Sequence, residues 1–309
     1  MSYEEAKRYS DAKVAKIREA LNAIPNCGEI VVVCGSYARR EACEHSDIDF
    51  FVIAPFNSTE TRTQMEEIQD TVRGVVANAP SADGAFAQQD YRDQMLLNIG
   101  GDLDSNQKIT RRILLLLEAD WVANESGFKS LRDEILHRYI SDGMKDHQLA
   151  LFLLNDIIRY YRTVCVDFEF KTAEHEGRKP WGIRNIKLVF SRKLLYASGL
   201  FSVAMTTDRT AGDKRKVLGD LFNMPVIDRM IEICGRDKMN KVLQSYDRFL
   251  TTMADSKMRE QLNAIKLENR DDIAFRQLKN EGIHFTRQLL ALFENTFDAT
   301  HHIRRAVIF

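Results

Sequence analysis

Two β-branched runs stand between helical patterns in the first third of the chain. Residues 29–34 (EIVVVC) and 47–54 (DIDFFVIA) are short, apolar and closed by Gly or Pro, so each predicts a strand. Residues 3–24 place apolar side chains at helical spacing, and residues 59–77 precede a proline, so both predict helices. A helical turn is predicted over 36–43, directly after the first strand. This order of elements is typical of an α/β unit.

The strand signal fades after residue 108, and helical patterns follow one another to the end of the chain. Helices are predicted over 109–124, 131–139, 146–167, 183–198, 214–222, 237–254 and 271–297. The fold class expected is therefore an α/β (α+β) domain with a small mixed sheet, followed by an all-α helical domain. We place the first domain at residues 1–120 and the helical domain at residues 121–309.

Composition narrows the class of protein. The 309 residues are 44% hydrophobic, which favours a folded chain over a disordered one. Lysine and arginine (44) nearly balance aspartate and glutamate (45), and the net charge of −1 weakly disfavours a large nucleic-acid substrate. Five cysteines without a CxxC pair, and a start without an apolar signal core, predict a reduced, cytoplasmic protein. No apolar run approaches the ~20 residues that cross a bilayer, so no membrane association is expected.

The second predicted strand begins with two carboxylates. Asp47 and Asp49 are two residues apart, so on a strand they point to the same face, while Ile48, Phe50 and Val52 point to the opposite face. Carboxylates held side by side repel each other, and a hard divalent cation with a preference for oxygen ligands relieves that repulsion. We therefore expect Asp47 and Asp49 to bind Mg²⁺ or Mn²⁺. A solvated acidic pair at a strand start is the structural alternative.

A Gly-Ser pair follows the first predicted strand. Gly35 lets the backbone approach a ligand closely, and N–H groups at the start of a helical turn after Ser36 can bind phosphate. A metal site facing a phosphate cradle is the arrangement of two-metal catalysis, in which one cation activates the attacking hydroxyl and another neutralises pyrophosphate. The expected chemistry is nucleotidyl transfer from a nucleoside triphosphate.

The stretch from Gly35 to Asp49 resembles the signature of the DNA polymerase β-type nucleotidyltransferase superfamily. The common form of that signature is Gly-Ser, Ala-Arg-Gly-Glu and then Ser-Asp-x-Asp. The matching positions are Gly35, Ser36, Ala38, Arg39, Glu41, Ala42, Ser46, Asp47 and Asp49. The sequence departs from the pattern at Arg40, where glycine is usual, and this change bears on the breadth of the nucleotide pocket.

The resemblance implies a third carboxylate on a later strand. Asp83, at the start of a plausible strand after the 59–77 helix, is the expected third metal ligand and catalytic residue beside Asp47 and Asp49. Asp90 and Asp93 compete for this role, although their spacing is closer to that of a capped start of a short helix.

Four further side chains are candidates for nucleotide binding beside Gly35 and Ser36. Arg39 and Ser46 lie within the signature, where Arg39 could equally be part of an ordinary helix face and Ser46 could cap a turn. Lys187 and Arg192 belong to a basic cluster that could neutralise a triphosphate, or could fold against acidic neighbours.

The later segments are similar to protein-modifying nucleotidyltransferases, the glutamine synthetase adenylyltransferases and PII uridylyltransferases. In these enzymes a Thr-Arg-containing helix follows the catalytic sheet, as Thr110-Arg111-Arg112 does here. The similarity is closer still to the uncharacterised nucleotidyltransferase-like proteins grouped with them. It implies a protein acceptor in preference to a nucleic acid, whereas the oligomeric state is left open.

The sequence thus predicts a metal-dependent nucleotidyltransferase that uses a nucleoside triphosphate, with ATP favoured. Residues 1–120 would form the catalytic domain, and residues 121–309 would select the acceptor. Two alternatives have the same fold: a non-catalytic nucleotide-sensing or protein-interaction module, and an RNA-tailing enzyme. The second would require a continuous basic groove that leads to the acidic site.

Overall fold

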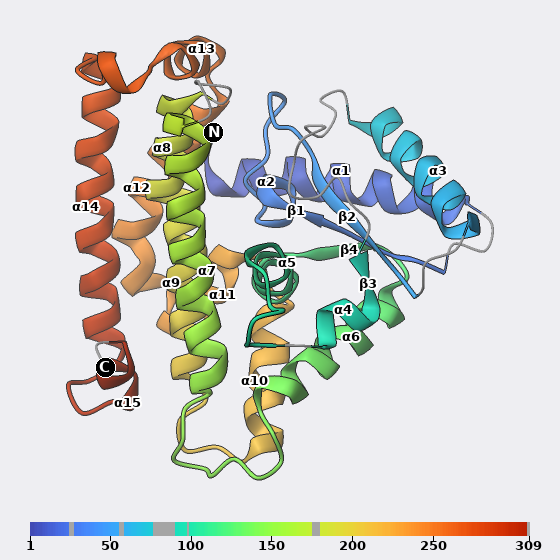
Figure 1. Ribbon diagram of the computed structural model, residues 1–309. Coiled ribbons are helices and arrows are strands. Elements are labelled where there is room, and N and C mark those ends of the chain that lie inside the picture. The colour runs from blue at the N-terminus through green and yellow to red at the C-terminus, as the bar shows by residue number, and fades with distance from the viewer. Residues whose placement is uncertain (25–27, 56–58, 77–89, 98, 175–179, 308–309) are drawn as a thin grey trace. The chain divides into compact units, whose positions relative to one another are not determined.

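The computed structural model divides the chain into two compact units, which are described separately (Figure 1). The sheet unit comprises Glu4–Lys145 and Thr210–Pro225, and the helical unit comprises Met1–Tyr3, Asp146–Arg209 and Val226–Phe309. The structure describes all residues except 25–27, 56–58, 77–89, 98, 175–179 and 308–309.

A small mixed sheet forms the centre of the sheet unit. Its strands are β1 (Ile30–Cys34), β2 (Asp49–Ala54), β3 (Asp90–Tyr91) and β4 (Asp120–Ala123), in the order β3-β2-β1-β4. Strand β1 is antiparallel to both β2 and β4, whereas the short β3 pairs with β2 in parallel. The predicted fold class, an α/β domain with a small mixed sheet followed by a helical region, is confirmed.

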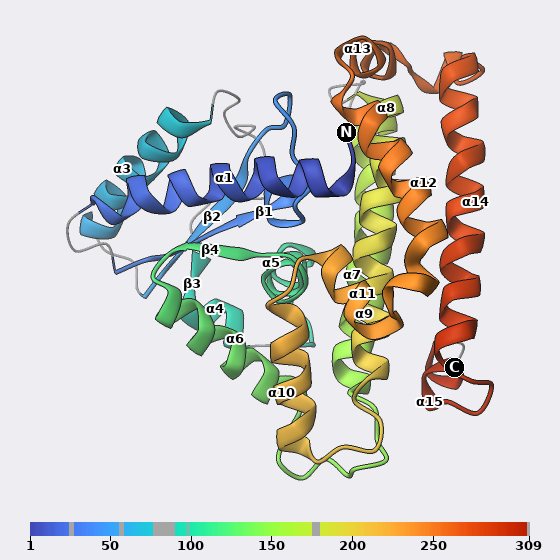
Figure 2. The same cartoon turned by 180° about the vertical axis from the view of Figure 1, so that it is seen from behind.

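Helices cover the sheet on both faces. The helices of the sheet unit are α1 (Tyr3–Asn22), α2 (Gly35–Ala38), α3 (Thr59–Val75), α4 (Arg92–Leu96), α5 (Asn106–Leu117), α6 (Glu125–Tyr139) and α10 (Ala211–Phe222). Ile17 of α1 and Val72 of α3 share a core cluster with Val31 and Val33 of β1. Helices α5 and α6 also contact β1. All five residues of β1 are buried, because an apolar run without alternation suits a strand that is covered on both faces (Figure 2).

The prediction of one helix over 109–124 is wrong in its second part. Helix α5 ends at Leu117, and Asp120–Ala123 form strand β4. The backbone of β4 pairs with β1, with Trp121 opposite Val32. A long-range partner therefore overrides the helical pattern of a leucine-rich segment.

The division between the units lies further along the chain than the predicted boundary at residues 120 and 121. That boundary falls at the first residue of β4, which is hydrogen-bonded to β1. The sheet unit continues to Lys145 and also takes in α10, which packs on α6. Arg215 of α10 donates to the backbone oxygen of Ile140 at 2.8 Å.

The helical unit is built around packed aromatic rings. Its elements are α7 (Leu151–Glu169), η1 (Phe170–Glu174), α8 (Trp181–Lys187), η2 (Leu188–Arg192), α9 (Lys193–Ala204), α11 (Val226–Cys234), α12 (Arg236–Ala254), α13 (Ser256–Ala264), η3 (Leu267–Asn269), α14 (Ile273–Thr296) and α15 (His302–Ala306). The buried ring of Phe190 stacks on Phe249 at 4.8 Å and lies 5.1 Å from Phe285, which joins η2, α12 and α14.

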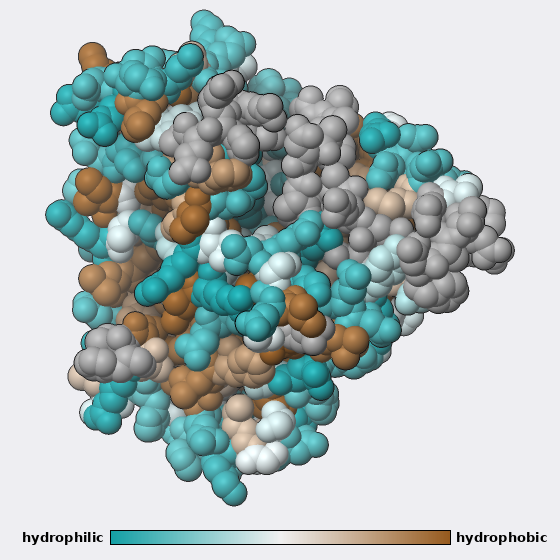
Figure 3. Space-filling view, in the orientation of Figure 1, coloured by the Kyte–Doolittle hydropathy of each residue, from teal (hydrophilic) through white to brown (hydrophobic). Residues whose placement is uncertain are grey.

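Hydrophilic side chains cover most of the described surface on the face shown in Figure 3. Among the described residues, no helix combines the length and the apolar character that crossing a bilayer requires.

Candidate functional site

The turn after β1 places a backbone without a side chain against a carboxylate. Gly35 has a φ of +66°, and a Cβ atom added there would lie 2.3 Å from Oδ2 of Asp49. Asp49 is the first residue of β2 and pairs in register with Cys34, the last residue of β1. Glycine is thus required twice, for its backbone conformation and for the close approach of the Asp49 carboxylate.

Burial around Asp49 follows the predicted alternation. Ile48, Phe50 and Val52 belong to the core cluster, whereas Asp49 is half-buried and Asp47 is exposed. The charge of Asp47 also acts on Tyr37 of α2, whose pKa is raised mainly by burial and further by neighbouring groups. Asp47 and Asp49 therefore lie on the side of the chain away from the core, beside the turn that Gly35 begins.

A buried ion-pair network lies behind the turn. The N–H of Gly35 donates to Oε1 of Glu118 at 2.9 Å, and Nη1 of Arg39 donates to Oε2 of the same carboxylate at 2.5 Å. Nε of Arg39 donates to Glu41 at 3.0 Å. The side chains of Arg39, Glu41 and Glu118 are 6%, 3% and 0% exposed. The signature arginine therefore anchors the turn, and its contact with a nucleotide stays a prediction.

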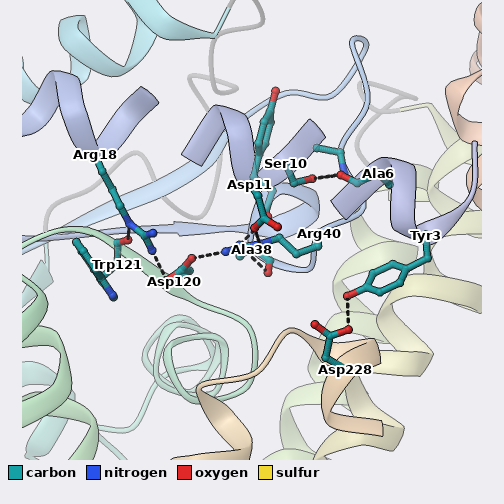
Figure 4. A network of polar contacts seen from close by, with 12 residues as sticks. Tyr3, Ala6, Ser10, Asp11, Arg18, Ala38, Arg40, Asp120, Trp121 and Asp228 are labelled. Atoms are coloured by element: carbon teal, nitrogen blue, oxygen red, sulfur yellow. Dashed lines mark hydrogen bonds and ion pairs between the residues drawn. The ribbon is translucent and has the colours of Figure 1, made fainter. Parts of the chain in front are cut away.

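Arg40 occupies the position at which glycine is usual in the signature. Its φ is +63°, a left-handed conformation that accounts for the usual glycine. The guanidinium donates to Asp11 at 2.7 Å and to Asp120 at 2.7 Å, and Nη1 donates to the backbone oxygens of Tyr37 at 3.1 Å and Ala38 at 3.3 Å (Figure 4). The side chain thus ties the end of α2 to α1 and β4.

Asp120 extends this network to Arg18, in the C-terminal part of α1. Nη2 of Arg18 donates to Asp120 at 2.8 Å, and Nε of Arg18 donates to the backbone oxygen of Trp121 at 3.0 Å (Figure 4). The Arg18 guanidinium also lies over the Trp121 ring, 4.0 Å from its centre. Asp120 therefore joins two arginines from different elements.

The two signature serines act on the backbone near the carboxylates. Oγ of the buried Ser46 accepts the N–H of Cys43 at 3.0 Å, and the N–H of Ser46 donates to the Cys43 oxygen at 2.9 Å. This closes a turn directly before Asp47. The half-buried Ser36 accepts the N–H of Glu41 through its backbone oxygen at 2.8 Å. Nucleotide binding by Ser36 and Ser46 stays a prediction.

The predicted third carboxylate, Asp83, lies outside the described residues. Its competitor Asp90 belongs to strand β3, parallel to β2, with Ile53 as its register partner. The short helix predicted at this segment is present as α4, which begins at Arg92 with Asp93 in its first turn, although the N-cap residue Tyr91 makes no side-chain cap bond. The register of β3 with β2 places Asp90 four residues along β2 from Asp49, or about 13 Å at the rise of a strand, so its position does not favour Asp90 over Asp83 as the third ligand.

The basic cluster belongs to the helical unit. Lys187 ends α8 and Arg192 ends η2, and both are half-buried. Their neighbour Lys193 donates to Thr286 at 2.7 Å, and its pKa is lowered by burial and then by the charge of Lys279. Cationic side chains thus gather between the end of α8 and the start of α9. Nucleotide binding by Lys187 and Arg192 stays a prediction.

The carboxylates at the turn fit a hard divalent cation. Asp47 and Asp49 offer only oxygen ligands, and the missing side chain of Gly35 leaves backbone beside them. Within the part of the chain that the structure describes, no three His, Cys, Asp or Glu side chains form a complete metal-binding cluster. Two protein ligands suit Mg²⁺, which usually takes further ligands from water and substrate phosphates.

A comparison with protein families matches the first part of the chain. Residues 14–94 match the model of the nucleotidyltransferase domain. The matched segment runs from α1 into α4 and contains Gly35, Asp47 and Asp49. The chain therefore carries a nucleotidyltransferase domain near its N-terminus. A comparison with curated proteins finds no match.

Sequence reasoning did not identify Glu118 and Asp120. Both lie outside the signature, where they hold Gly35, Arg39 and Arg40. No local signal marked them: Glu118 and Asp120 follow directly after the four leucines that end at Leu117, and their partners Arg39 and Arg40 lie 79 and 80 residues away in the chain.

Proposed function

We propose that this protein is a metal-dependent nucleotidyltransferase. It would move a nucleoside monophosphate from a nucleoside triphosphate, with ATP favoured, to an acceptor hydroxyl, and release pyrophosphate. The observation that carries the proposal is the packing of the Asp49 carboxylate against Gly35, with Asp47 two residues before it, inside the matched nucleotidyltransferase segment.

The residues at the turn have separate tasks. The backbone N–H of Ser36 would bind the phosphates of the triphosphate, beside Gly35, whose own N–H is held by Glu118. Asp47 and Asp49 would hold Mg²⁺ or Mn²⁺, with Asp83 as the third carboxylate and Asp90 as the alternative to it. When bound, the cation neutralises phosphate charge and lowers the pKa of the attacking hydroxyl.

The other candidates would contribute to binding and positioning of the nucleotide. Arg39 would act through the turn, because its guanidinium is held by Glu41 and Glu118. Ser46 would position Asp47 through the turn that it closes. Lys187 and Arg192 would neutralise part of the charge of the triphosphate.

The transfer balances without any further reactant. The acceptor oxygen forms a bond to the α-phosphorus, and the bond from that phosphorus to the oxygen bridging to the β-phosphate breaks. Pyrophosphate leaves with that oxygen, and the hydroxyl proton passes to solvent. The acceptor is proposed to be a protein, on the resemblance to the adenylyltransferases and uridylyltransferases. A cytoplasmic location is proposed from the cysteine pattern.

Transfer of label from each α-labelled nucleoside triphosphate tests the proposal. The protein is incubated with Mg²⁺ or Mn²⁺, with and without cell lysate, beside Asp47→Asn/Asp49→Asn. The matched control is Asp70→Asn, which removes an exposed carboxylate on α3. We expect label on protein, reduced about a hundredfold or more in the double variant and unchanged in the control.

The same assay separates the rival functions. Label on RNA would favour the RNA-tailing enzyme, and metal-dependent nucleotide binding without transfer would favour the sensor. Label that moves equally well in the double variant would contradict the proposed site. Comparison of Asp83→Asn with Asp90→Asn identifies the third carboxylate, because only the true ligand should abolish transfer.

A further inference from the structure

A cavity of about 360 Å³ lies in the sheet unit, behind the signature turn. Its wall is formed by residues of α1, β4, α6 and the segment after α10, and all of them belong to the sheet unit. Ala38 and Arg40 of the turn also line it, whereas Asp47 and Asp49 do not. The volume is near the lower end of the range for small-molecule sites, about 300–1,000 Å³.

The carboxylates in the wall already have cationic partners. Asp120 accepts from both Arg18 and Arg40, and Glu125 pairs with Lys129 at 2.7 Å. Glu118 pairs with Arg39, which lies outside the wall. Each acidic side chain in the wall therefore has a cationic partner other than Arg132, which is the remaining cation of the wall.

Arg132 of α6 is buried, with 5% of its surface exposed, and its partners are neutral. Nη1 donates to the side-chain oxygen of Asn223 at 3.1 Å, and Nη2 donates to the backbone oxygen of Leu116 at 3.3 Å. Its guanidinium lies 4.9 Å from the ring centre of Phe128. Among the described residues, no carboxylate oxygen lies within 4.0 Å of a guanidinium nitrogen of Arg132, so Arg132 forms no ion pair there.

A buried cation with only neutral partners is costly. Burial lowers the pKa of Arg132 to about 10, although the charges of Asp120 and Asp133 partly offset this effect. Proteins rarely bury a guanidinium without an anion, because the neutral contacts replace only part of its hydration. An anion in the cavity would supply the missing partner.

We propose that this cavity is a binding site for a small molecule that carries a phosphate or carboxylate group, with Arg132 as its principal ligand. The planar guanidinium suits an oxyanion with two oxygens in one plane. Lys129 would add a second positive charge at the mouth, because its side chain is 57% exposed and lines the cavity. The site is independent of the proposed transferase activity.

Calorimetric titration of the full chain with inorganic phosphate, and separately with succinate, tests the proposal at constant ionic strength. We expect saturable binding of at least one of them, weakened about tenfold or more in Arg132→Met. The phosphate and succinate arms show which oxyanion is preferred. The matched control is Arg138→Met, which removes an exposed arginine from the same helix.

A second variant protects the test against a folding defect in Arg132→Met. Lys129→Met changes an exposed side chain and should weaken binding by a few fold while the circular dichroism spectrum is unchanged. Binding that is equal in the wild type and both cavity variants would overturn the proposal. Competitive displacement of phosphate by Mg²⁺-ATP, in the wild type and in Arg132→Met alike, would also overturn the proposal. The phosphate would then bind at the signature turn. Failure of the wild type to bind either anion would overturn the proposal too, whatever the outcome of the label-transfer assay.

Discussion

At the scale of single residues, two left-handed backbone positions enclose the signature turn. Gly35 has no alternative, because Asp49 occupies the space of a side chain. Arg40 is an L-residue in the same region of φ, which costs roughly 1–2 kcal/mol. Its ion pairs with Asp11 and Asp120 offset that cost. One position is thus fixed by space and the other by side-chain contacts.

Gly35→Ala should uncouple the carboxylate from the turn. The new methyl group would meet Oδ2 of Asp49 at 2.3 Å, so the carboxylate or the turn must move. We expect loss of metal-dependent transfer and destabilisation by about 1–3 kcal/mol, measured by label transfer and urea unfolding. Gly74→Ala is the control: nothing lies within 4 Å of its added methyl group, so activity should persist and stability should rise slightly. Full activity in Gly35→Ala would refute the assigned geometry.

Two substitutions of Arg40 separate the free-energy cost of its left-handed backbone from the stabilisation by its side-chain ion pairs. Arg40→Ala keeps the left-handed conformation and loses both ion pairs, so we expect destabilisation of about 2–4 kcal/mol. Arg40→Gly loses the same pairs but relieves the backbone, and should be more stable than Arg40→Ala by about 1 kcal/mol. Chemical denaturation of both variants measures the difference. Equal stabilities would show that the backbone at this position carries no strain.

The spacing of residue types predicted that Asp47 and Asp49 lie away from the core. It did not predict which side chains hold the turn in place. The spacing of Asp47 and Asp49 is local, and the core positions of Ile48 and Phe50 follow from it. The role of Arg39 depends on Glu118, which is 79 residues away in the chain. Such a pairing leaves no periodic signal, so the sequence could not distinguish an anchoring arginine from one that contacts a nucleotide.

At the scale of elements, strand β4 shows the same limit. The run of leucines before Glu118 is compatible with a helix, and the next residues continue that pattern. Only the pairing of Trp121 with Val32 makes β4 a strand. Helices α1 and α3, by contrast, were predicted well because their apolar faces are encoded locally.

Helix α5 is joined to its neighbours by a fully buried ion pair. Arg112 donates to both carboxylate oxygens of Asp104, at 3.1 and 2.8 Å, and its Nε donates to the hydroxyl of Tyr139 at 2.7 Å. Both charged side chains are 0% exposed. This network connects the segment before α5 to α6.

Removal of one member of this pair should be far more harmful than removal of both. Arg112→Met leaves the buried Asp104 carboxylate without its cation, and we expect a loss of about 3–5 kcal/mol in unfolding free energy. Arg112→Met/Asp104→Leu removes both charges and should recover a large part of that loss. Urea unfolding of the wild type, the single variants Arg112→Met and Asp104→Leu and the double variant measures the coupling. Additive losses would contradict a direct ion pair between the two side chains.

At the scale of the whole molecule, the chain passes between the two units more than once. It leaves the sheet unit after Lys145, returns for Thr210–Pro225 and leaves again. Sequence patterns predicted a sheet domain followed by a helical one, but the return of α10 to α6 depends on long-range packing. The residues predicted to bind the nucleotide also belong to different units. Gly35, Asp47 and Asp49 are part of the sheet unit, whereas Lys187 and Arg192 are part of the helical unit.

Titration of the protein with Mn²⁺, followed by electron paramagnetic resonance with and without ATP, tests the proposed cation site. Asp47 and Asp49, beside Gly35, are proposed to hold the cation that accompanies the nucleotide. We expect Mn²⁺ to bind to the wild type more tightly with ATP, and to be lost in Asp47→Asn/Asp49→Asn but not in Asp70→Asn. Mn²⁺ binding of equal strength in the double variant would contradict the account.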